Sequence, residues 1–317
     1  MKKRISSSAP VKKKNGFFKE VYKSRVLLLM LLPAIILVFI FNYIPMGGAI
    51  LAFKKYNYQQ GIWGSDWSGL NNFKFFFQSG TALTVTRNTA LYNIAFIAIN
   101  TILEISFAII LSEMLKKWFK KLIQSFIFLP YFISWVIVGS IAYSLLNYET
   151  GTLNAILTGM GIDRINFYSS GGYWPFITII FNAWKGVGYG MVVYLAAIAG
   201  VDESLQEAAS IDGANIFQRI RYVTLPTLTP TVITLTLLAL GRVFRGNLDL
   251  FYQLVGQNGA LFAYTDVIDT YVFRLTLASS DIGRTVAVGL YQSVLCLITI
   301  LISNWIVKRK EEQYSLF

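Results

Sequence analysis

The chain has 317 residues, of which 55% are hydrophobic and 14% are charged, and its formal net charge is +12. A mean hydropathy of +0.54, together with apolar runs long enough to cross a bilayer, excludes an ordinary soluble protein and predicts an integral membrane protein. The sequence contains no histidine, which excludes Ser-His and Cys-His catalytic arrangements and the usual zinc sites.

The sequence also lacks the motifs of nucleotide chemistry. It has no GxxxxGK(S/T) loop, so no P-loop is expected on this chain. Gly186, Gly188 and Gly190 resemble a dinucleotide fingerprint, but they lie within an apolar run and favour close helix packing. Cys296, the single cysteine, is interpreted as a packing residue. We therefore expect no catalytic residue, no cofactor and no metal on this chain.

The apolar runs predict an all-helical membrane protein with six transmembrane helices, each near the roughly 20 residues that a bilayer core requires. Their predicted bounds are residues 26–44, 90–114, 122–147, 174–200, 226–247 and 286–307. The expected organisation is a basic tail (1–25), a transmembrane domain (26–307) and a C-terminal tail (308–317). No convincing small-residue cleavage site follows the first run, which is therefore interpreted as an uncleaved signal anchor.

Lysine and arginine gather at three places that predict the orientation in the membrane. They precede the first run, separate the second run from the third (residues 116–121), and follow the last run (residues 308–310). Positive charge near the ends of spans tends to stay in the cytoplasm. An even number of spans with both termini cytoplasmic satisfies all three clusters. The clusters also account for most of the net charge, so nucleic-acid binding is not expected.

Between the fourth and fifth runs lies a polar, helix-forming segment, residues 201–225. Its first helix is predicted over residues 204–211, with Asp202 at the start, where the helix dipole favours negative charge. Gly213 supplies a stop. A second, amphipathic helix follows from Asn215, with Phe217 and Ile220 on its apolar stripe. The predicted orientation puts this segment in the cytoplasm.

The same segment carries a specific motif: Glu207-Ala208-Ala209, three residues, Gly213, nine residues, then Val223-Thr224-Leu225-Pro226. This spacing resembles the coupling element in the membrane domains of binding-protein-dependent ABC importers. The resemblance implies that Glu207, Ala208, Ala209, Asp212, Gly213, Leu225 and Pro226 form the part that docks on an ATPase subunit. An ordinary helical loop, stabilised only by its caps, is the alternative.

The resemblance extends over nearly the whole chain and is strongest to sugar-importer permeases. The matching residues are Phe128-Leu129-Pro130, Gly151 with Asn154, Trp184, Tyr194-Leu195-Ala196-Ala197, and Ala208 through Ala214. Gly200-Val201-Asp202 is similar to the Gly-Ile-Asp of the branch named for lipoprotein-associated and polysaccharide transport. The chain departs from the family in having Val223 for isoleucine, Glu104 within a normally apolar span, and no large inserted periplasmic domain.

Ionisable residues within the apolar runs are the candidates for a substrate path, because a charge that faces lipid is costly. They are Glu104 in the second run and Arg242, Arg245 and Asp249, which fall at i, i+3 and i+7 and so on one predicted helical face. The alternative is that the arginines reach to the membrane interface and Asp249 balances them. The neighbouring Phe251 and Tyr252 suit either a sugar or an interfacial aromatic belt.

The sequence predicts a transport function and no covalent chemistry. The resemblance implies a permease subunit of an ABC importer for a sugar or oligosaccharide, in the plasma membrane, working by alternating access. It also implies a second homologous permease, two copies of a cytoplasmic ATPase that binds ATP-Mg, and an extracytoplasmic solute-binding protein. An ion-coupled secondary transporter is the alternative, although Glu104 is nearly alone as an intramembrane ionisable group. The absence of histidine and of paired carboxylates within the spans argues against a membrane enzyme.

Overall fold

The structure is a computed structural model that describes residues 22–278 and 281–317. Most of the predicted basic tail, residues 1–21, lies outside the described residues. The chain divides into two compact units, Met1–Ile50 and Leu51–Phe317. Each unit has its own contacts and is described separately.

The described part of the first unit is an apolar helix. It consists of α2 (Arg25–Val38), a π-helical stretch (Phe39–Tyr43) and α3 (Ile44–Met46), and it leads into a 3-10 turn (Gly47–Phe53). The side chains of α2 are not buried within the protein, although the helix is rich in leucine and isoleucine. A long helix that exposes apolar side chains all round is typical of a segment surrounded by lipid.

A small hairpin and a short helix begin the second unit. Strand β1 (Lys54–Lys55) pairs antiparallel with β2 (Asp66–Trp67), α4 (Gly61–Gly64) lies between them, and α5 (Asn71–Gln78) follows. Lys54 is buried at 7% exposure, and its Nζ donates hydrogen bonds to the carbonyl oxygens of Ile62 and Trp63. These bonds satisfy the buried ammonium group and close the turn.

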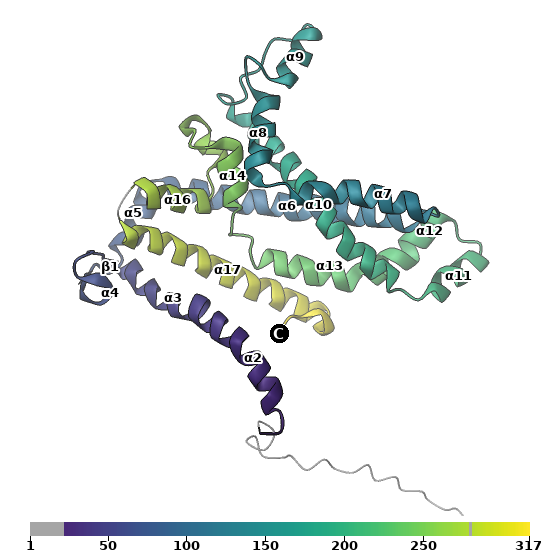
Figure 1. The fold of residues 1–317 in the computed structure, drawn as a ribbon, viewed down its shortest axis with the longest axis horizontal. Coiled ribbons are helices and arrows are strands. Elements are labelled where there is room, and N and C mark those ends of the chain that lie inside the picture. Colours follow the sequence, from purple (N-terminus) through teal and green to yellow (C-terminus); the bar gives the residue numbers. More distant parts are fainter. Residues whose placement is uncertain (1–21, 279–280) are drawn as a thin grey trace, which may run out of the picture. The chain divides into compact units, whose positions relative to one another are not determined.

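The second unit is organised around α6 (Thr81–Ser112) and α10 (Trp174–Ala199), which pack along each other more extensively than any other pair of elements (Figure 1). Helix α6 contributes to three separate apolar clusters. Ala82 and Val85 belong to the first, Tyr92 and Phe96 to the second, and Ala108 and Leu111 to the third. Because one unbroken helix passes through all three clusters, it connects the two ends of the unit.

The predicted third span (122–147) is not one straight helix. The structure has α7 (Lys117–Phe128), a 3-10 turn (Leu129–Phe132) and α8 (Trp135–Leu146), with a bend of 96°. Pro130 lies in the turn and Ile133 is extended. The Ser134 hydroxyl then accepts a hydrogen bond from the Ile137 N–H and starts α8 as a new helix. Proline and an N-cap serine are the residues expected at such a break.

The remaining elements complete the second unit. They are α9 (Thr152–Gly159), a 3-10 turn (Gly171–Tyr173), α11 (Glu203–Ile211), α12 (Ile216–Arg219), a π-helical stretch (Ile220–Thr224), α13 (Leu225–Leu240), α14 (Leu248–Val255), a 3-10 turn (Gly259–Leu261), α15 (Phe262–Thr265), α16 (Ile268–Ala278), α17 (Ile282–Lys310) and a last 3-10 turn (Glu312–Tyr314). Helix α17 packs against α5, α13 and α16, and α14 packs against α8.

Within the described residues, five helices are long and apolar enough to cross a membrane, or six if α7 and α8 count as one span. They include the predicted first, second, fourth, fifth and sixth runs. The protein is therefore a helical membrane protein. The count of six spans depends on how the bent pair lies in the bilayer, and the cytoplasmic location of both termini stays a prediction.

Candidate functional site

The second unit contains a cavity of about 800 Å3, a volume typical of small-molecule binding sites. Its walls are α6, α10 and α13, the segment after α13, the start of α14, and α16. The polar and charged residues that line it are Asn93, Asn100, Thr101, Glu104, Asn182, Tyr189, Tyr194, Thr236, Arg242, Arg245, Asn247, Asp249 and Asp269. A cavity with this lining suits a ligand rich in hydrogen-bonding groups.

The wall formed by α6 is a polar stripe on an otherwise apolar helix. Asn93, Ile97, Asn100 and Glu104 follow one another at i, i+4, i+7 and i+11, so they share one helical face and all line the cavity. Sequence analysis singled out Glu104 alone. The same spacing in the sequence was the signal that could have identified the two asparagines as well.

Glycines on α10 give the polar stripe its room. A Cβ atom at Gly190 would overlap the Glu104 carboxyl group, and one at Gly186 would lie 3.6 Å from the Asn100 Nδ2. Gly188 faces away from them, and a Cβ there would overlap the Ile127 carbonyl oxygen. The prediction of close helix packing is thus confirmed for Gly188 and Gly190, and at Gly190 the close neighbour is a charged side chain.

The prediction that Arg242, Arg245 and Asp249 share one helical face is wrong. Helix α13 ends at Leu240 rather than continuing to residue 247, and Asp249 belongs to the separate helix α14. The side-chain oxygen of Asn247 accepts a hydrogen bond from the Leu250 N–H at 3.1 Å and caps α14. A Gly-Asn pair is a turn signal, and Gly246-Asn247 marked this break in the sequence.

The three residues nevertheless line the same cavity, because the segment after α13 is held in place from three sides. Asn93 on α6 donates a hydrogen bond to the Arg245 carbonyl oxygen at 3.2 Å. Gln292 on α17 donates one to the Phe244 carbonyl oxygen at 2.8 Å. On α16, the Asp269 carboxylate accepts hydrogen bonds from the Gly246 N–H and from Gln292.

Asp269 is a cavity residue that sequence analysis missed, since it lies far from Glu104 and the arginines in the chain. Burial raises the pKa of the Asp269 carboxyl, and the hydrogen bonds from Gly246 and Gln292 oppose that rise, as does the charge of Arg245. The carboxylate therefore stabilises the backbone next to Arg245, and it keeps that residue at the cavity wall.

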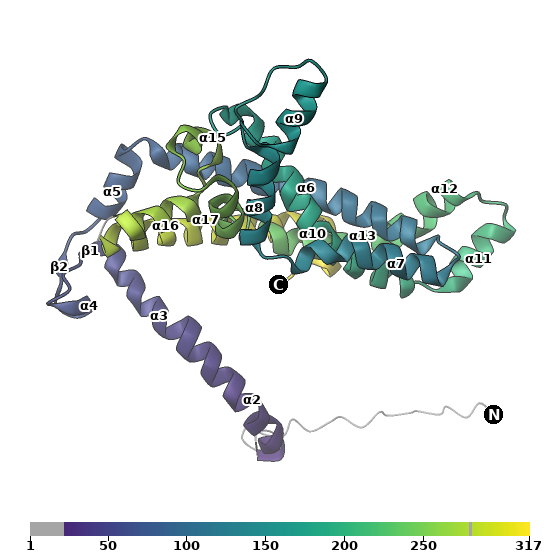
Figure 2. The ribbon, with the colours of Figure 1, turned by 45° about the horizontal axis from the view of Figure 1, so that its top comes forward.

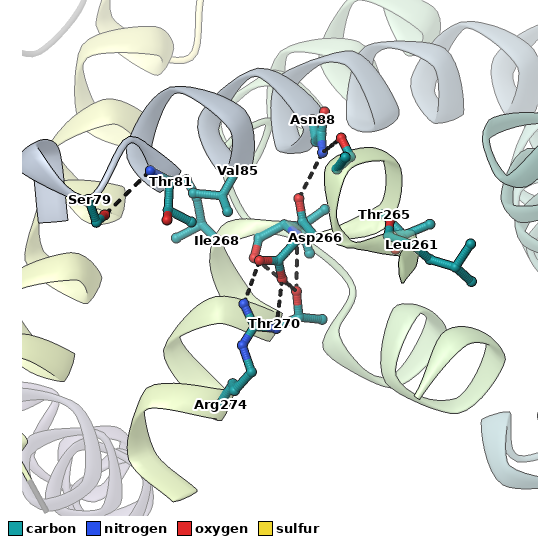
Figure 3. A network of polar contacts seen from close by, with 12 residues as sticks. Ser79, Thr81, Val85, Asn88, Leu261, Thr265, Asp266, Ile268, Thr270 and Arg274 are labelled. Carbon is teal, nitrogen blue, oxygen red and sulfur yellow. Dashed lines mark hydrogen bonds and ion pairs between the residues drawn. The ribbon is translucent and has the colours of Figure 1, made fainter. Parts of the chain in front are cut away.

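Helix α16 is itself fixed to α6 by a second polar network, drawn in Figure 3. Asn88 donates hydrogen bonds to the carbonyl oxygens of Ala263 and Asp266. The Asp266 carboxylate, 4% exposed, forms an ion pair with Arg274 and accepts a hydrogen bond from the Thr270 hydroxyl at 2.7 Å. This network sets the position of α16, and with it the position of Asp269 beside the cavity.

The two aromatic residues considered for sugar contact do not line the cavity. Phe251 is 2% exposed, and its ring packs 4.9 Å from that of Tyr92. The Tyr252 ring packs against Phe273 at 5.1 Å. The aromatic residues that do line the cavity include Tyr189 and Tyr194 from α10.

The segment that carries the sequence motif folds as predicted, as a short helix, a turn and a second helix. Asp202 accepts a hydrogen bond from the Ser204 N–H at 2.9 Å, which lowers the pKa of the Asp202 carboxyl. Gly213 has a φ of +80°, a conformation that residues with a side chain adopt only at a cost. Asn215 and Gln218 form a reciprocal capping box at the start of α12.

The motif residues Glu207, Ala208, Asp212 and Gly213 are exposed. Leu225 and Pro226 begin α13. Helix α13 follows α12 and the π-helical stretch without a gap. Arg219 on α12 forms an ion pair with Glu113 at 3.3 Å, and Glu113 is the C-cap of α6. The motif segment therefore lies against the C-terminal end of the helix that lines the cavity (Figure 2).

Comparison with known proteins gives a consistent result. Residues 104–312 match the family described as binding-protein-dependent transport system inner membrane component. Protein LplB of Bacillus subtilis is 32% identical over 92% of this chain and 91% of its own length. The polygalacturonan/rhamnogalacturonan transport system permease protein YteP of the same organism is 31% identical over 95% of this chain and 93% of its own.

Among solved structures, a chain from a bacterial ABC transporter involved in the import of the acidic polysaccharide alginate superposes with a TM-score of 0.83. It is 32% identical, and the match covers 93% of this chain and 99% of that chain. A second structure of an alginate transporter, in complex with a periplasmic protein that carries an alginate pentasaccharide, also gives 0.83 at 32% identity. The family match and the matches to LplB and YteP extend over most of the chain. The chain therefore belongs to the inner membrane components of binding-protein-dependent transport systems.

Proposed function

We propose that this chain is the transmembrane permease subunit of an ATP-driven importer in the plasma membrane, and that it moves an oligosaccharide by alternating access. The cavity between α6, α10 and α13 is the substrate site in this proposal. The named relatives support the substrate class, because they include a polygalacturonan/rhamnogalacturonan permease and an alginate importer. The chain performs no covalent chemistry itself.

One observation carries the proposal: the motif segment is joined to the cavity wall by a specific contact. The Arg219–Glu113 ion pair connects α12 with the end of α6, and Glu104 lies nine residues before Glu113 on that helix. At 1.5 Å per residue the distance along α6 is about 13 Å. A displacement of the motif segment by a docked ATPase is therefore transmitted by a rigid helix to the cavity.

The proposal requires partners that supply energy and substrate. Two cytoplasmic ATPase subunits bind ATP-Mg and dock on the motif segment, a second homologous permease completes the membrane pathway, and an extracytoplasmic binding protein delivers the oligosaccharide. The exposed apolar side chains of Ile211, Phe217 and Tyr222, at 86%, 79% and 71% exposure, support a protein partner for the motif segment. The predicted orientation puts the motif segment in the cytoplasm, which is the compartment of such an ATPase.

Within oligosaccharides, the cavity favours an acidic one. Arg242 and Arg245 line it, and no ion pair engages either guanidinium among the residues that the structure describes. A guanidinium binds a carboxylate through two parallel hydrogen bonds. A uronic-acid oligosaccharide offers such a carboxylate on each ring.

Uptake of labelled trigalacturonate by cells that carry the wild-type gene or a deletion tests the function. Uptake should need the gene and should persist when the proton gradient is collapsed while ATP is maintained. Loss of uptake as soon as the gradient collapses would favour an ion-coupled secondary transporter instead.

The Arg219–Glu113 contact is tested by exchanging its charges in the same uptake assay. Arg219→Glu should reduce uptake about tenfold, equivalent to about 1.4 kcal/mol of lost coupling, without reducing the amount of protein in the membrane. The double exchange Arg219→Glu with Glu113→Arg should recover most of that uptake. A double variant no better than the single one would show that the ion pair does not transmit the motion.

A further inference from the structure

The cavity is lined by two side chains, Asn100 and Glu104, whose acceptor oxygens have no donor within the described part of the chain. The Asn100 Oδ1 atom is buried and has no hydrogen-bond partner in residues 22–278 and 281–317. The Glu104 carboxyl, one helical turn further along the same face, forms no hydrogen bond or ion pair with any residue that the structure describes. Buried acceptors are almost always satisfied in folded proteins. The Asn100 Oδ1 atom is an exception to this rule, and both Asn100 and Glu104 line the cavity, so a ligand there is in a position to supply the donors.

The fold keeps space open at these acceptors. Gly190 on α10 lies so close to Glu104 that any side chain there would displace the carboxyl group. Gly186, one turn earlier, leaves ordinary van der Waals room next to Asn100. The two polar side chains therefore fit between α6 and α10 without closing the cavity that they line.

The acceptors lie at the opposite end of the cavity wall from the arginines. Asn93 is hydrogen-bonded to the Arg245 carbonyl oxygen, which fixes where the arginine segment meets α6. Glu104 lies eleven residues further along that helix, a distance of about 16 Å at 1.5 Å per residue. The cavity thus has an end where Arg242 and Arg245 lie with Asp249 and Asp269, and an end that offers the carboxyl and amide oxygens of Glu104 and Asn100.

We propose that Asn100 and Glu104 form a subsite that accepts hydrogen bonds from ring hydroxyl groups of the transported oligosaccharide. This inference rests on the proposed function and adds the chemistry of recognition to it. The arginine end binds carboxylates, and the acceptor end binds hydroxyl groups of a ring further along the chain. A carboxyl group with two oxygens matches a pair of neighbouring hydroxyls. The subsite thereby recognises the polyol character of the ligand, which acidic and neutral sugars share.

A metal ion is a less suitable occupant of this end of the cavity. No group of three or more carboxylate, cysteine or histidine side chains that could hold a metal occurs within residues 22–278 and 281–317. One carboxyl and one amide provide too few ligands for a calcium or magnesium site made by the protein.

The test measures KM and maximal rate of trigalacturonate uptake, together with competition by the same trisaccharide after reduction of its carboxyl groups to alcohols. Glu104→Gln should raise the KM for trigalacturonate about tenfold, with little change in maximal rate. It should raise the inhibition constant of the reduced sugar by the same factor. Asn100→Ala should raise both about threefold to tenfold. Arg242→Gln should raise the KM for the acidic sugar and leave the inhibition constant of the reduced sugar unchanged, since the reduced sugar has no carboxylate.

Two matched controls separate binding from a general effect on the helix. Ser106→Ala changes an exposed position on α6 whose hydroxyl is bonded to the Ile102 carbonyl oxygen at 2.7 Å, and it should leave KM unchanged. Gly190→Ala should raise KM as Glu104→Gln does, because the methyl group displaces the carboxyl group. Gly186→Ala adds the same methyl one turn away, where the nearest atom is at 3.6 Å, and should have a much smaller effect.

The results distinguish this inference from the proposed function. If the wild-type protein takes up trigalacturonate and KM is the same in Glu104→Gln, Asn100→Ala and Gly190→Ala, the subsite is wrong and the importer function stands. If these variants lower the amount of protein in the membrane while KM of the remainder is unchanged, the acceptors are structural and the subsite is again wrong. If the wild-type chain takes up neither sugar, the proposed substrate class fails, and the subsite fails with it.

Discussion

The ion pair between Asp266 and Arg274 provides the sharpest test of how the cavity is held together. Asp266 is 4% exposed and Arg274 is 27% exposed. The pair is bidentate, with one Nη1 to Oδ1 hydrogen bond of 3.1 Å and a second between Nη2 and Oδ2. The Arg274 guanidinium also lies over the Phe262 ring at 4.0 Å. The two partners thus differ greatly in their access to water.

This difference predicts an asymmetric effect of removing either partner. Arg274→Ala leaves a buried carboxylate that still accepts the Thr270 hydroxyl hydrogen bond but has lost its ion pair. Breaking a buried pair in this way costs about 3–5 kcal/mol. Because Thr270 remains and part of Arg274 reaches solvent, we expect the lower limit, about 3 kcal/mol of the free energy of unfolding. The double variant with Asp266→Ala should be less destabilised than Arg274→Ala, since no charge is then left buried.

The assay is unfolding of the purified protein in mixed micelles by increasing fractions of denaturing detergent. The control is Arg284→Ala, which removes a more exposed ion pair of 2.9 Å with Asp281, at 38% and 35% exposure, and the contact of the guanidinium with the Phe75 ring. Exposed pairs of this kind contribute about 0–1 kcal/mol. If Arg274→Ala destabilises the protein no more than Arg284→Ala does, or if the double variant is the less stable one, the reasoning from burial is refuted.

The remaining predictions concern orientation, coupling and energy. In a Cys296→Ser background, cysteine at Asp163 should react with an impermeant thiol reagent in intact cells and cysteine at Lys117 should not; labelling of position 117 would reverse the predicted orientation. Gly213→Ala should reduce co-purification of the ATPase, because φ is +80° there and an alanine costs about 1–2 kcal/mol in that conformation. The control is Gly161→Ala, which has a similar φ of +77° but lies outside the motif segment, and it should leave co-purification unchanged. Purified alone, the chain should hydrolyse no ATP; measurable turnover would contradict the assignment of hydrolysis to partner subunits.

The helical break after Leu240 shows where reasoning from periodicity stops. The apolar run and the spacing of Arg242, Arg245 and Asp249 favoured one continuous helix with one polar face. In the structure, hydrogen bonds donated by Asn93 and Gln292 and one accepted by Asp269 hold a non-helical segment instead. Two of these three side chains come from helices that follow in the sequence. A local pattern contains no information about such distant partners.

The sequence by itself determined the features that depend on neighbouring residues. Apolar runs of bilayer length identified the long helices, because hydrocarbon requires about 20 apolar residues per crossing. Capping by Asp202 and Asn215, and the left-handed turn at Gly213, defined the helix–turn–helix of the motif segment, since caps and turns are satisfied within a few residues. The spacing of the motif also sufficed to identify the family.

Only the tertiary structure decided how the polar residues meet. It bent the predicted third span at residues 129–134, buried Phe251 in a core, and brought Asp269 to the same cavity as Glu104. It also showed that Gly190 leaves room for the Glu104 carboxyl and that the Asn100 amide oxygen lacks a donor among the described residues. These outcomes depend on which surfaces of α6, α10, α13 and α16 pack together. Packing is set by contacts between residues that are far apart in the chain, so no local spacing predicts it.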